Sequence, residues 1–353
     1  GLICIEEKRQ FGKIVMIPSE SLCPKPVRQA LASGFTNIYA EGYPSARLAR
    51  EGLEGLLDYP RQMSYARRYS NRRFYKGCEY VDFVEVLCQK RAATLFASDE
   101  YPAERIFVNV QPLSGAAANN AVYDALVKPG DAVMGMNLTH GGHLTHGSKY
   151  NRSGKNYAIH SYGVDEATGR LDYGAIRRMA EECRPKMIIA GASSYPWDID
   201  WQALREIADS VGAYVLADIA HPAGLVVAGL FPNPVGVAHV TSFTTHKTLC
   251  GPRGAALVST DEDIAKKIDS AVFPGEQGGP HINAIAAKAV SFKLAMTDQF
   301  KELQTKTVEN AAHLAECLKS RRLKLAYGGT NTHLLLVDLN GVRAENGVPL
   351  KGE

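Results

Sequence analysis

A lysine with hydroxyl and imidazole neighbours, Lys247, lies in the segment 244–248. The β-branched run at 240–244 predicts the end of a buried strand, and the glycine- and proline-containing run at 251–254 predicts a turn. Most lysines of a folded chain are solvated surface residues. Desolvation and neighbouring positive charge can nevertheless lower the pKa of a lysine until it attacks an aldehyde to form a Schiff base. Lys247 is therefore a candidate nucleophile at the end of a strand.

A second apolar strand, expected at 213–217, carries Asp218 and His221 at its carboxyl end. Open α/β sheets bind ligands beyond the carboxyl ends of their strands, so these side chains and Lys247 should face one site. Pyridoxal 5'-phosphate (PLP) needs a lysine for its aldehyde and a carboxylate for its pyridinium nitrogen. Lys247 and Asp218 supply both groups, which predicts a PLP site.

A run of small residues at 111–120 follows the strand expected at 106–110 and opens a helix. The amino terminus of a helix binds phosphate through free N–H groups and the helix dipole. Ser114, Gly115 and Ala116 are therefore candidate phosphate ligands. The alternative is that these small side chains serve only close packing.

Three histidines, His140, His143 and His146, occur within seven residues after the strand expected at 132–136. Clustered histidines are common ligands of zinc. No cysteine or carboxylate stands near them in the sequence to complete a ligand set, so we do not expect a metal site here.

Three segments resemble the serine hydroxymethyltransferase family and occur in the same order as in the family. They are 37–44, its amino-terminal active-site segment, 136–147, its cofactor-stacking and folate segment, and 244–254, its cofactor-lysine signature. The resemblance runs from about residue 5 to about residue 340. It implies a PLP-dependent transferase of fold type I (aspartate aminotransferase-like), an α/β fold with a mainly parallel central sheet in its large domain.

The resemblance also implies a division of the chain. An N-terminal helical arm would cover 1–35, and a large PLP-binding domain would cover 36–325 with an insertion at about 48–72. Residues 326–353 would begin a small C-terminal α/β domain that is mostly absent here. The family's arginine for the substrate carboxylate would lie in that absent part, and we expect the given sequence to be incomplete at both ends.

Site residues follow from the positions that match the family's motifs. The resemblance implies catalytic roles for Lys247, Glu41, Tyr75, His246 and Thr244. It implies that PLP is bound by Lys247, Asp218, His221, His143, Ser114, Gly115, Ala116, Ser193, Tyr39, Gly278 and Gly279. It places the amino acid and the folate against Ser19, Leu138, Gly142 and Leu144, although Ser19 could instead cap a helix.

Particular tasks are implied for some of these residues. His143 would stack on the PLP ring, and Tyr39 would reach the site of the other subunit. Glu41 would serve as the acid–base group, because a carboxyl with a raised pKa in a closed site can do so. Ala116 stands where the family usually has a hydroxyl residue, and Glu276 stands where a glycine is more usual. Because the carboxylate of Glu276 and the phosphate of PLP would repel each other, we expect Glu276 to point away from the phosphate.

The main departure from the family is an insertion at 48–72, rich in arginine and tyrosine. Its first half, 48–57, has helical spacing but two glycines, which weakens the prediction of a helix. The insertion could cover the substrate, contact a partner or simply loop out, and loops absorb added length at little cost. Tyr75 keeps its family position only if the insertion does not displace it.

Alternating strands and helices are expected from residue 106 onward, which predicts a parallel sheet with right-handed crossovers. The apolar runs place strands at 106–110, 132–136, 187–192, 213–217, 240–244 and 255–259. The helical patterns place helices at 81–96, 201–212 and 282–319, with the tail of another at 6–17.

Composition restricts the possible partners. The 353 residues are 45% hydrophobic, enough for one large domain and a smaller piece. A net charge of +3 without a basic run gives no reason to expect nucleic acid or a membrane surface. Seven scattered cysteines favour reduced thiols in the cytoplasm, and no apolar stretch approaches the roughly 18 residues of a membrane span. By resemblance, the partners would be serine, glycine, tetrahydrofolate and further subunits, in a homodimer or a tetramer of dimers.

The reaction that the resemblance implies is reversible transfer of the serine hydroxymethyl carbon to tetrahydrofolate, giving glycine and 5,10-methylenetetrahydrofolate, without a metal. Three alternatives stay open: a folate-independent aldolase for threonine or another β-hydroxy amino acid, an α-methylserine-type specificity, and an inactive scaffold or regulatory homologue. The segment 140–147 and Glu41 favour the folate transferase. The joint presence of Lys247, Asp218, His221, His143 and Glu41 favours an enzyme.

Overall fold

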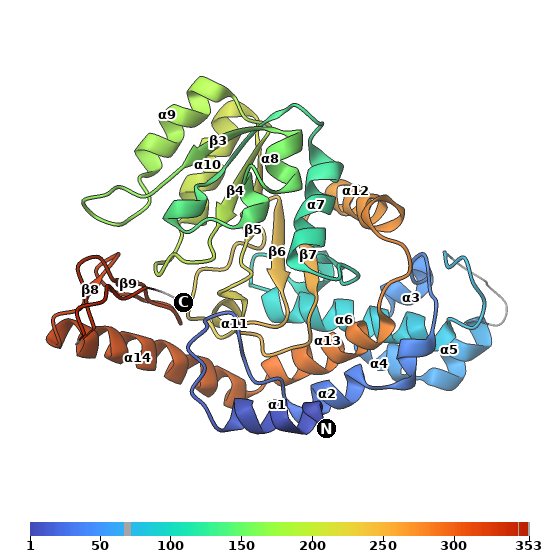
Figure 1. Cartoon of the computed structure of the whole chain (residues 1–353). Helices are drawn as coiled ribbons and strands as arrows, with labels where there is room; N and C mark the ends of the chain where they lie inside the picture. Colours follow the sequence, from blue (N-terminus) through green and yellow to red (C-terminus); the bar gives the residue numbers. More distant parts are fainter. Residues whose placement is uncertain (67–71, 345, 352–353) are drawn as a thin grey trace.

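The computed structural model describes residues 1–66, 72–344 and 346–351. A seven-stranded sheet forms its centre, in the order β1-β7-β6-β5-β4-β2-β3 (Figure 1). The strands are β1 (Phe107–Asn109), β2 (Ala132–Met136), β3 (Ala158–Tyr162), β4 (Met187–Gly191), β5 (Tyr214–Asp218), β6 (Val240–Thr244) and β7 (Ala255–Ser259). Helices surround this sheet, which confirms the α/β fold class.

Five neighbouring strands, β3, β2, β4, β5 and β6, run parallel. At the other edge, β7 pairs antiparallel with β6, and β1 pairs antiparallel with β7. The prediction of a mainly parallel sheet is confirmed. β3 is an addition to the expected strands, because His160 and Ser161 interrupt the apolar run that identifies a buried strand.

Side chains alternate between the two faces of the sheet, as the period of a strand requires. In β4, Ile188 and Ala190 join one apolar core, whereas Met187 and Ile189 join the other. The first core includes residues of α6 (Glu79–Phe96), α9 (Tyr173–Cys183), α10 (Trp201–Val211), α11 (Ala223–Val227) and α13 (Ile282–Ala295). The second includes residues of α7 (Gly115–Leu126) and α12 (Glu262–Ser270). With both faces covered, the carboxyl edge of the parallel strands is left for polar side chains.

Helix bounds differ from expectation in two places. The helix expected at 282–319 is two helices, α13 and α14 (Asp298–Ser320). Thr297 separates them, because its hydroxyl caps α14 by accepting a hydrogen bond from the Phe300 N–H at 3.3 Å. At the amino terminus, α1 (Leu2–Phe11) ends before Gly12, so the prediction that this helix continues to residue 17 is wrong. The bounds of α6 and α10 agree with the expected ones within two residues.

The described part of the insertion, with the two residues before it, forms three short helices, α3 (Ala46–Arg50), α4 (Leu53–Leu57) and α5 (Tyr59–Ala66). Leu48 and Leu56 are buried in a small apolar core with Phe83 and Val86 of α6. The insertion therefore packs beside α6 on one side of the molecule (Figure 1). The part of the insertion at 67–71 lies outside the described residues.

The remaining elements are short. Two of them are the helices α2 (Lys25–Leu31) and α8 (Arg152–Asn156), and α2 packs against α13. The strands β8 (Lys324–Leu325) and β9 (Val337–Asp338) form an antiparallel pair. Helical turns lie at Gly34–Asn37, Ala103–Arg105, Leu138–His140, Leu144–His146 and Ala271–Glu276. Within the described ranges, no helix has the length and apolar character needed to cross a lipid bilayer.

Candidate functional site

Lys247 follows β6 by three residues, at the carboxyl edge of the parallel strands, and its side chain is buried. Burial disfavours the ammonium and lowers the pKa of Lys247, with the charge of Arg253 acting in the same direction and Asp218 opposing it. The carbonyl of Lys247 accepts a hydrogen bond from the Cys250 N–H at 2.9 Å. The backbone at Lys247 is thus held by a turn, and burial makes the amine lose a proton more readily than that of a surface lysine.

Asp218 is the last residue of β5, the neighbour of β6, and it is buried as well. Its Oδ2 lies 3.0 Å from Nε2 of His146 and accepts a hydrogen bond from Nδ2 of Asn119 at 2.9 Å. Burial alone would raise the pKa of this carboxyl, but the hydrogen bond and charge of His146 outweigh burial and hold the pKa below its usual range. Asp218 is therefore a fixed, ionised carboxylate at a strand end.

Asn119 connects Asp218 to two hydroxyl groups. Its Nδ2 also donates to Oγ1 of Thr145 at 2.8 Å, and its Oδ1 accepts a hydrogen bond from Oγ of Ser242 at 2.8 Å. Sequence reasoning did not predict this supporting role for Asn119, Thr145, His146 and Ser242, although it noted His146 in the histidine cluster. The available signal was an asparagine one turn into a helix that otherwise begins with small apolar residues.

His143 lies beside this network, with its Nδ1 2.8 Å from Oγ1 of Thr145. Burial lowers the pKa of His143, so its ring is neutral at pH 7. One ligand atom each of His143, His146 and Asp218 lie within 4.8 Å of one another, a spacing that could hold a metal ion. The sequence argument that no carboxylate is nearby is therefore wrong, because β5 brings Asp218 to the histidines. His146 and Asp218 are paired with each other in this arrangement.

The start of α7 lies beside the strand that precedes Lys247. Ser114 caps this helix, with its hydroxyl accepting a hydrogen bond from the Ala117 N–H at 3.2 Å. A Cβ atom at Gly115 would lie 2.8 Å from the methyl group of Thr244, so the glycine permits this close approach. The first N–H groups of a helix have no partner within the helix, and those at 114–116 are therefore available to an anion.

Glu276 has a cationic partner near the same helix. Its carboxylate pairs with Arg152 and accepts a hydrogen bond from Nδ2 of Asn120 at 3.2 Å. Arg152 also donates to Asp124 at 3.0 Å. The carboxylate of Glu276 is thus neutralised by an arginine.

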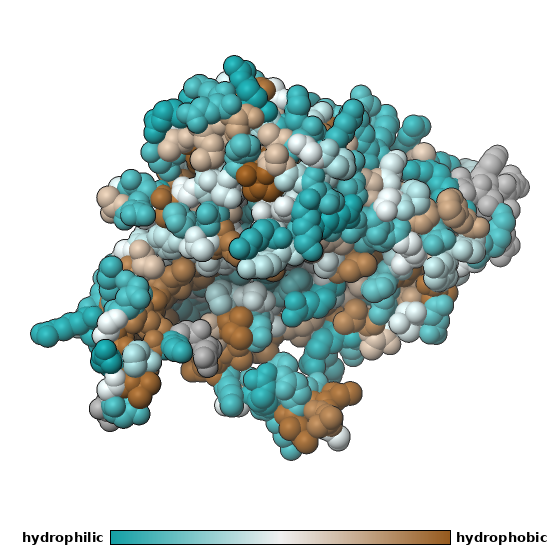
Figure 2. Space-filling model, turned by 45° about the horizontal axis from the view of Figure 1, so that its top comes forward, coloured by the Kyte–Doolittle hydropathy of each residue, from teal (hydrophilic) through white to brown (hydrophobic). Residues whose placement is uncertain are grey.

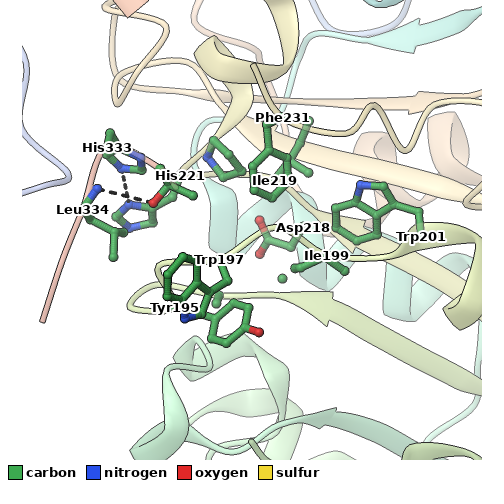
Figure 3. Close-up of a pocket in the computed structure, with 14 residues that line it drawn as sticks. Tyr195, Trp197, Ile199, Trp201, Asp218, Ile219, His221, Phe231, His333 and Leu334 are labelled. Atoms are coloured by element: carbon green, nitrogen blue, oxygen red, sulfur yellow. Dashed lines mark hydrogen bonds between the residues drawn. The ribbon is translucent and has the colours of Figure 1, made fainter. Parts of the chain in front are cut away.

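His221 pairs with a histidine from the C-terminal segment, His333 (Figure 3). Their rings stack with centroids 5.5 Å apart, and Nδ1 of His221 lies 3.3 Å from Nε2 of His333. Burial and the charge of Lys247 lower the pKa of His221 to about 2, and burial lowers that of His333 to about 4. Both rings are therefore neutral at pH 7.

With Asp218, these two histidines line a small cavity whose apolar part includes Tyr195, Trp197, Trp201 and Phe231. Sequence reasoning missed His333, which lies far from β5 along the chain.

Glu41 belongs to a second cluster. Its Oε2 accepts a hydrogen bond from the Tyr75 hydroxyl at 3.1 Å, and its Oε1 accepts one from the Tyr39 hydroxyl at 3.4 Å. Two glycines lie against this cluster. A Cβ atom at Gly278 would be 3.2 Å from the Glu41 carboxylate, and a Cβ atom at Gly279 would be 3.1 Å from the Tyr39 ring. The insertion has therefore not separated Tyr75 from Glu41.

This second cluster is open to solvent, with 61% of Tyr39 and 46% of Tyr75 exposed. Among the residues that the structure describes, no hydrogen bond or ion pair joins Glu41, Tyr39 or Tyr75 to Lys247 or Asp218. The predicted site residues thus form a buried group around Lys247 and an exposed group around Glu41.

Ser19 does not cap a helix. The next helix, α2, starts at Lys25 after Pro24, so that alternative is wrong. Ser21, two residues further on, donates a hydrogen bond to the carbonyl of His246 at 3.1 Å. The N-terminal loop therefore reaches the lysine segment through Ser21.

The predicted folate residues lie on the histidine segment. Leu138 and Leu144 are exposed, as contact with a ligand requires. Gly142 has no room for a side chain, because a Cβ atom would lie 2.0 Å from the carbonyl oxygen of Met136. The Ser193 N–H donates to the carbonyl of Gly141 at 2.7 Å, so Ser193 anchors this segment through its backbone.

The buried group fits PLP. It offers an amine with a lowered pKa at Lys247, an ionised acceptor at Asp218 and a helix start for the phosphate. Burial also lowers the pKa of His246 to about 4, and its Nδ1 is buried with no hydrogen-bond partner in the described part of the chain. That nitrogen is free to bond to a bound group. The fold and this site together define a PLP-dependent enzyme of fold type I.

Comparison with known families identifies the particular family. The model of the serine hydroxymethyltransferase family matches residues 50–348, most of the chain. The chain therefore belongs to the serine hydroxymethyltransferase family of PLP-dependent enzymes. The match includes the segments 136–147 and 244–254, whereas 37–44 precedes it. The resemblance found in the sequence is confirmed.

Proposed function

We propose that this chain catalyses the reversible transfer of the serine hydroxymethyl carbon to tetrahydrofolate, giving glycine and 5,10-methylenetetrahydrofolate. The observation that carries the proposal is the buried Lys247 beside the ionised Asp218, on neighbouring strands of a chain in this family. PLP bound there would supply an electron sink for the bonds at the amino acid's Cα.

Each residue of the buried group has its own task in this proposal. Lys247 attaches the cofactor and, because its pKa is lowered, exchanges a proton at Nζ. Asp218, fixed by His146 and Asn119, holds the proton on the pyridine nitrogen. His143 keeps the ring plane in position.

Other residues hold the remaining edges of the cofactor. The N–H groups of 114–116 would bind the phosphate, and the loop with Gly278 and Gly279 comes close to them, because the Leu113 N–H donates to Oε1 of Gln277 at 3.1 Å. His221 would bind near the ring oxygen, and Ser193 would support that side of the ring. Thr244 and His246 orient the lysine segment, where the Thr244 hydroxyl donates to the Ala220 carbonyl at 3.1 Å.

Glu41 moves the proton on the serine hydroxyl oxygen or on the folate. The hydrogen bonds from Tyr75 and Tyr39 support this role, because they orient both oxygens of the carboxyl. Leu138, Gly142 and Leu144 line the folate, and the loop with Ser19 and Ser21 lies on the amino-acid side, where Ser21 contacts the His246 carbonyl.

We further propose that two copies of the chain build each site, in a homodimer or a tetramer of dimers. The open Glu41 cluster of one copy would then cover the Lys247 group of the other. The N-terminal arm supports this arrangement, because it exposes apolar side chains that a monomer leaves in water: Leu2, Ile3, Ile5, Phe11, Ile14, Met16 and Ile17. Figure 2 shows apolar surface of this kind on one face of the molecule. The seven free cysteines support a cytoplasmic location.

The test is exchange of the glycine α-proton with solvent, followed by NMR on the PLP-loaded protein. We expect slow exchange with glycine alone and a large acceleration when tetrahydrofolate is added. Equal exchange with and without folate would favour the aldolase. If there is no exchange, and borohydride leaves no PLP on Lys247 by peptide mass, the proposal is wrong.

A further inference from the structure

Arg73, directly after the insertion, has a buried guanidinium, with 3% of its side chain exposed. It lies opposite Gly42 in an isolated antiparallel bridge. Its Nη1 donates to the carbonyl of Ala40 at 3.0 Å and to the carbonyl of Gly42 at 2.7 Å. One nitrogen of Arg73 thus binds the carbonyl groups on both sides of Glu41.

The other two guanidinium nitrogens bind carboxylates of α6. Nε donates to Oδ1 of Asp82 at 2.8 Å, and Nη2 donates to Oε2 of Glu85 at 2.6 Å. A guanidinium is planar and its donors point in fixed directions. Four hydrogen bonds to four partners therefore fix the relative positions of those partners as well as attracting them. Arg73 therefore ties the turn around Glu41 to a long core helix.

The neighbours of Arg73 hold the same turn. The Phe74 N–H donates to the carbonyl of Glu41 at 3.0 Å, and the Tyr43 N–H donates to the carbonyl of Arg72 at 3.1 Å. Gly42 has φ +99°, and a Cβ atom there would lie 2.0 Å from the Arg72 carbonyl oxygen. Only glycine permits the two chain segments to approach this closely at a positive φ. All three carbonyls of 40–42 are therefore held by residues 73 and 74.

Gln111 links the turn to the other half of the site. Its Nε2 donates to the Gly42 carbonyl at 2.9 Å and to Oε1 of Glu85 at 2.9 Å. Gln111 begins the segment that leads to Ser114 and the start of α7. The network around Arg73 thus continues into the segment proposed to bind phosphate.

From these contacts we propose that Arg73 is a positioning residue for Glu41. Its bonds go to carbonyl groups beside Glu41, whereas the carboxylate oxygens of Glu41 face Tyr39 and Tyr75. Arg73 therefore fixes the backbone that carries the carboxylate and does not bond to the carboxylate itself. This inference rests on the proposed acid–base role of Glu41.

The inference also explains why the insertion is compatible with the site. The chain leaves the turn after Gly42 and returns at Arg73, and these two residues form the bridge. The three inserted helices lie between them, packed on α6 through Leu48 and Leu56. The bridge fixes Glu41 and Tyr75 together independently of the length of the intervening chain.

The test variant is Arg73→Lys, which keeps the positive charge but cannot reach four partners from one planar group. We expect turnover with serine and tetrahydrofolate to fall on the order of 10²-fold, the effect of a displacement of about 1 Å at a reacting group. The hydrogen bonds from Tyr39 and Tyr75 to the Glu41 carboxylate do not involve Arg73 and should remain in the variant. Arg47→Lys is the matched control. Arg47 pairs with Glu51 and Gln62 within the insertion, and its variant should keep turnover.

A double-mutant cycle separates positioning from a general effect on the fold. In a Glu41→Gln background, Arg73→Lys should cause little further loss of turnover, because the group it positions no longer transfers a proton. An equally large loss in both backgrounds would overturn the proposal.

Amide hydrogen exchange on the full chain gives a readout that does not depend on turnover. The Phe74 and Tyr43 amides should exchange about 10-fold faster or more in Arg73→Lys, since bonds to a charged group are lost, and at the wild-type rate in Arg47→Lys. If Glu41→Gln keeps full turnover, the proton role of Glu41 is wrong, but exchange still decides whether Arg73 fixes the turn. Unchanged exchange at both amides would overturn the positioning role.

Discussion

The buried group around Lys247 and the exposed group around Glu41 are held by opposite means. At Asp218, side chains from α7, β6 and the histidine segment bond to one another inside the chain. At Glu41, the side chains are open to solvent and the backbone of the turn is fixed, by Arg73 and Phe74. A single copy thus organises the proposed cofactor site. The acid–base role proposed for Glu41 is favoured by a closed environment, which is why we propose that another copy covers the second group.

Asp218→Asn should have the largest effect and break the buried group alone. The replacement keeps the shape but removes the charge that His146 and Asn119 stabilise. We expect turnover to fall about 10²–10³-fold, the usual effect of losing a preorganised electrostatic partner. Steady-state kinetics measure it, with Asp198→Asn as the control at an exposed carboxylate paired with Arg170. Equal turnover of the two variants would contradict the assignment of Asp218.

Leu56→Ala tests whether the packing of the insertion on α6 stabilises the exposed group around Glu41. Leu56 is 1% exposed and packs with Phe83 and Val86 on the helix that binds Arg73. Removing this buried side chain should lower the free energy of unfolding by about 2–5 kcal/mol in urea denaturation. Leu57→Ala is the matched control, at a position that is 54% exposed, and should cost about 0.5 kcal/mol or less. Equal costs would show that the insertion is not packed on α6.

His333→Asn should change the pH dependence of stability by a smaller amount. Burial lowers the pKa of His333 to about 4, whereas an unfolded histidine titrates near 6.5. Between these values the unfolded chain binds a proton that the folded chain does not, so stability is lost as pH falls from 7 to 5. Between pH 7 and pH 5, the free energy of unfolding should therefore fall by about 2 kcal/mol less in the variant than in the wild type.

Urea denaturation at both pH values measures this difference. His281→Asn replaces an exposed histidine and is the control. A loss of the same size in the wild type and in His333→Asn would contradict a neutral, buried His333.

Lys247 and Asp218 could be found from the sequence because each follows or ends an apolar strand, and the carboxyl ends of parallel neighbours meet at one edge. The partners of Asp218 could not be found in this way. Asn119 lies on a helix and His146 in a loop, and only tertiary packing brings both to one oxygen. His333 shows the same limit, because no local pattern links it to His221.

Element boundaries were hardest to predict where one residue decides them. Thr297 interrupts a continuous helical pattern by capping α14. Gly12 ends α1, although mixed polar and apolar residues continue beyond it. β3 escaped prediction because an edge strand can carry polar side chains such as His160.

The most direct test of the account is complementation between Lys247→Ala and Glu41→Gln, each of which leaves one group intact. If two copies share each site, mixed and refolded protein contains hybrids with one complete site. Random pairing predicts recovery of about a quarter of wild-type turnover for a dimer. Native mass spectrometry establishes that hybrids are present. A mixture that contains hybrids but remains as inactive as its two parents would contradict the claim that the Glu41 group of one copy completes the Lys247 group of another.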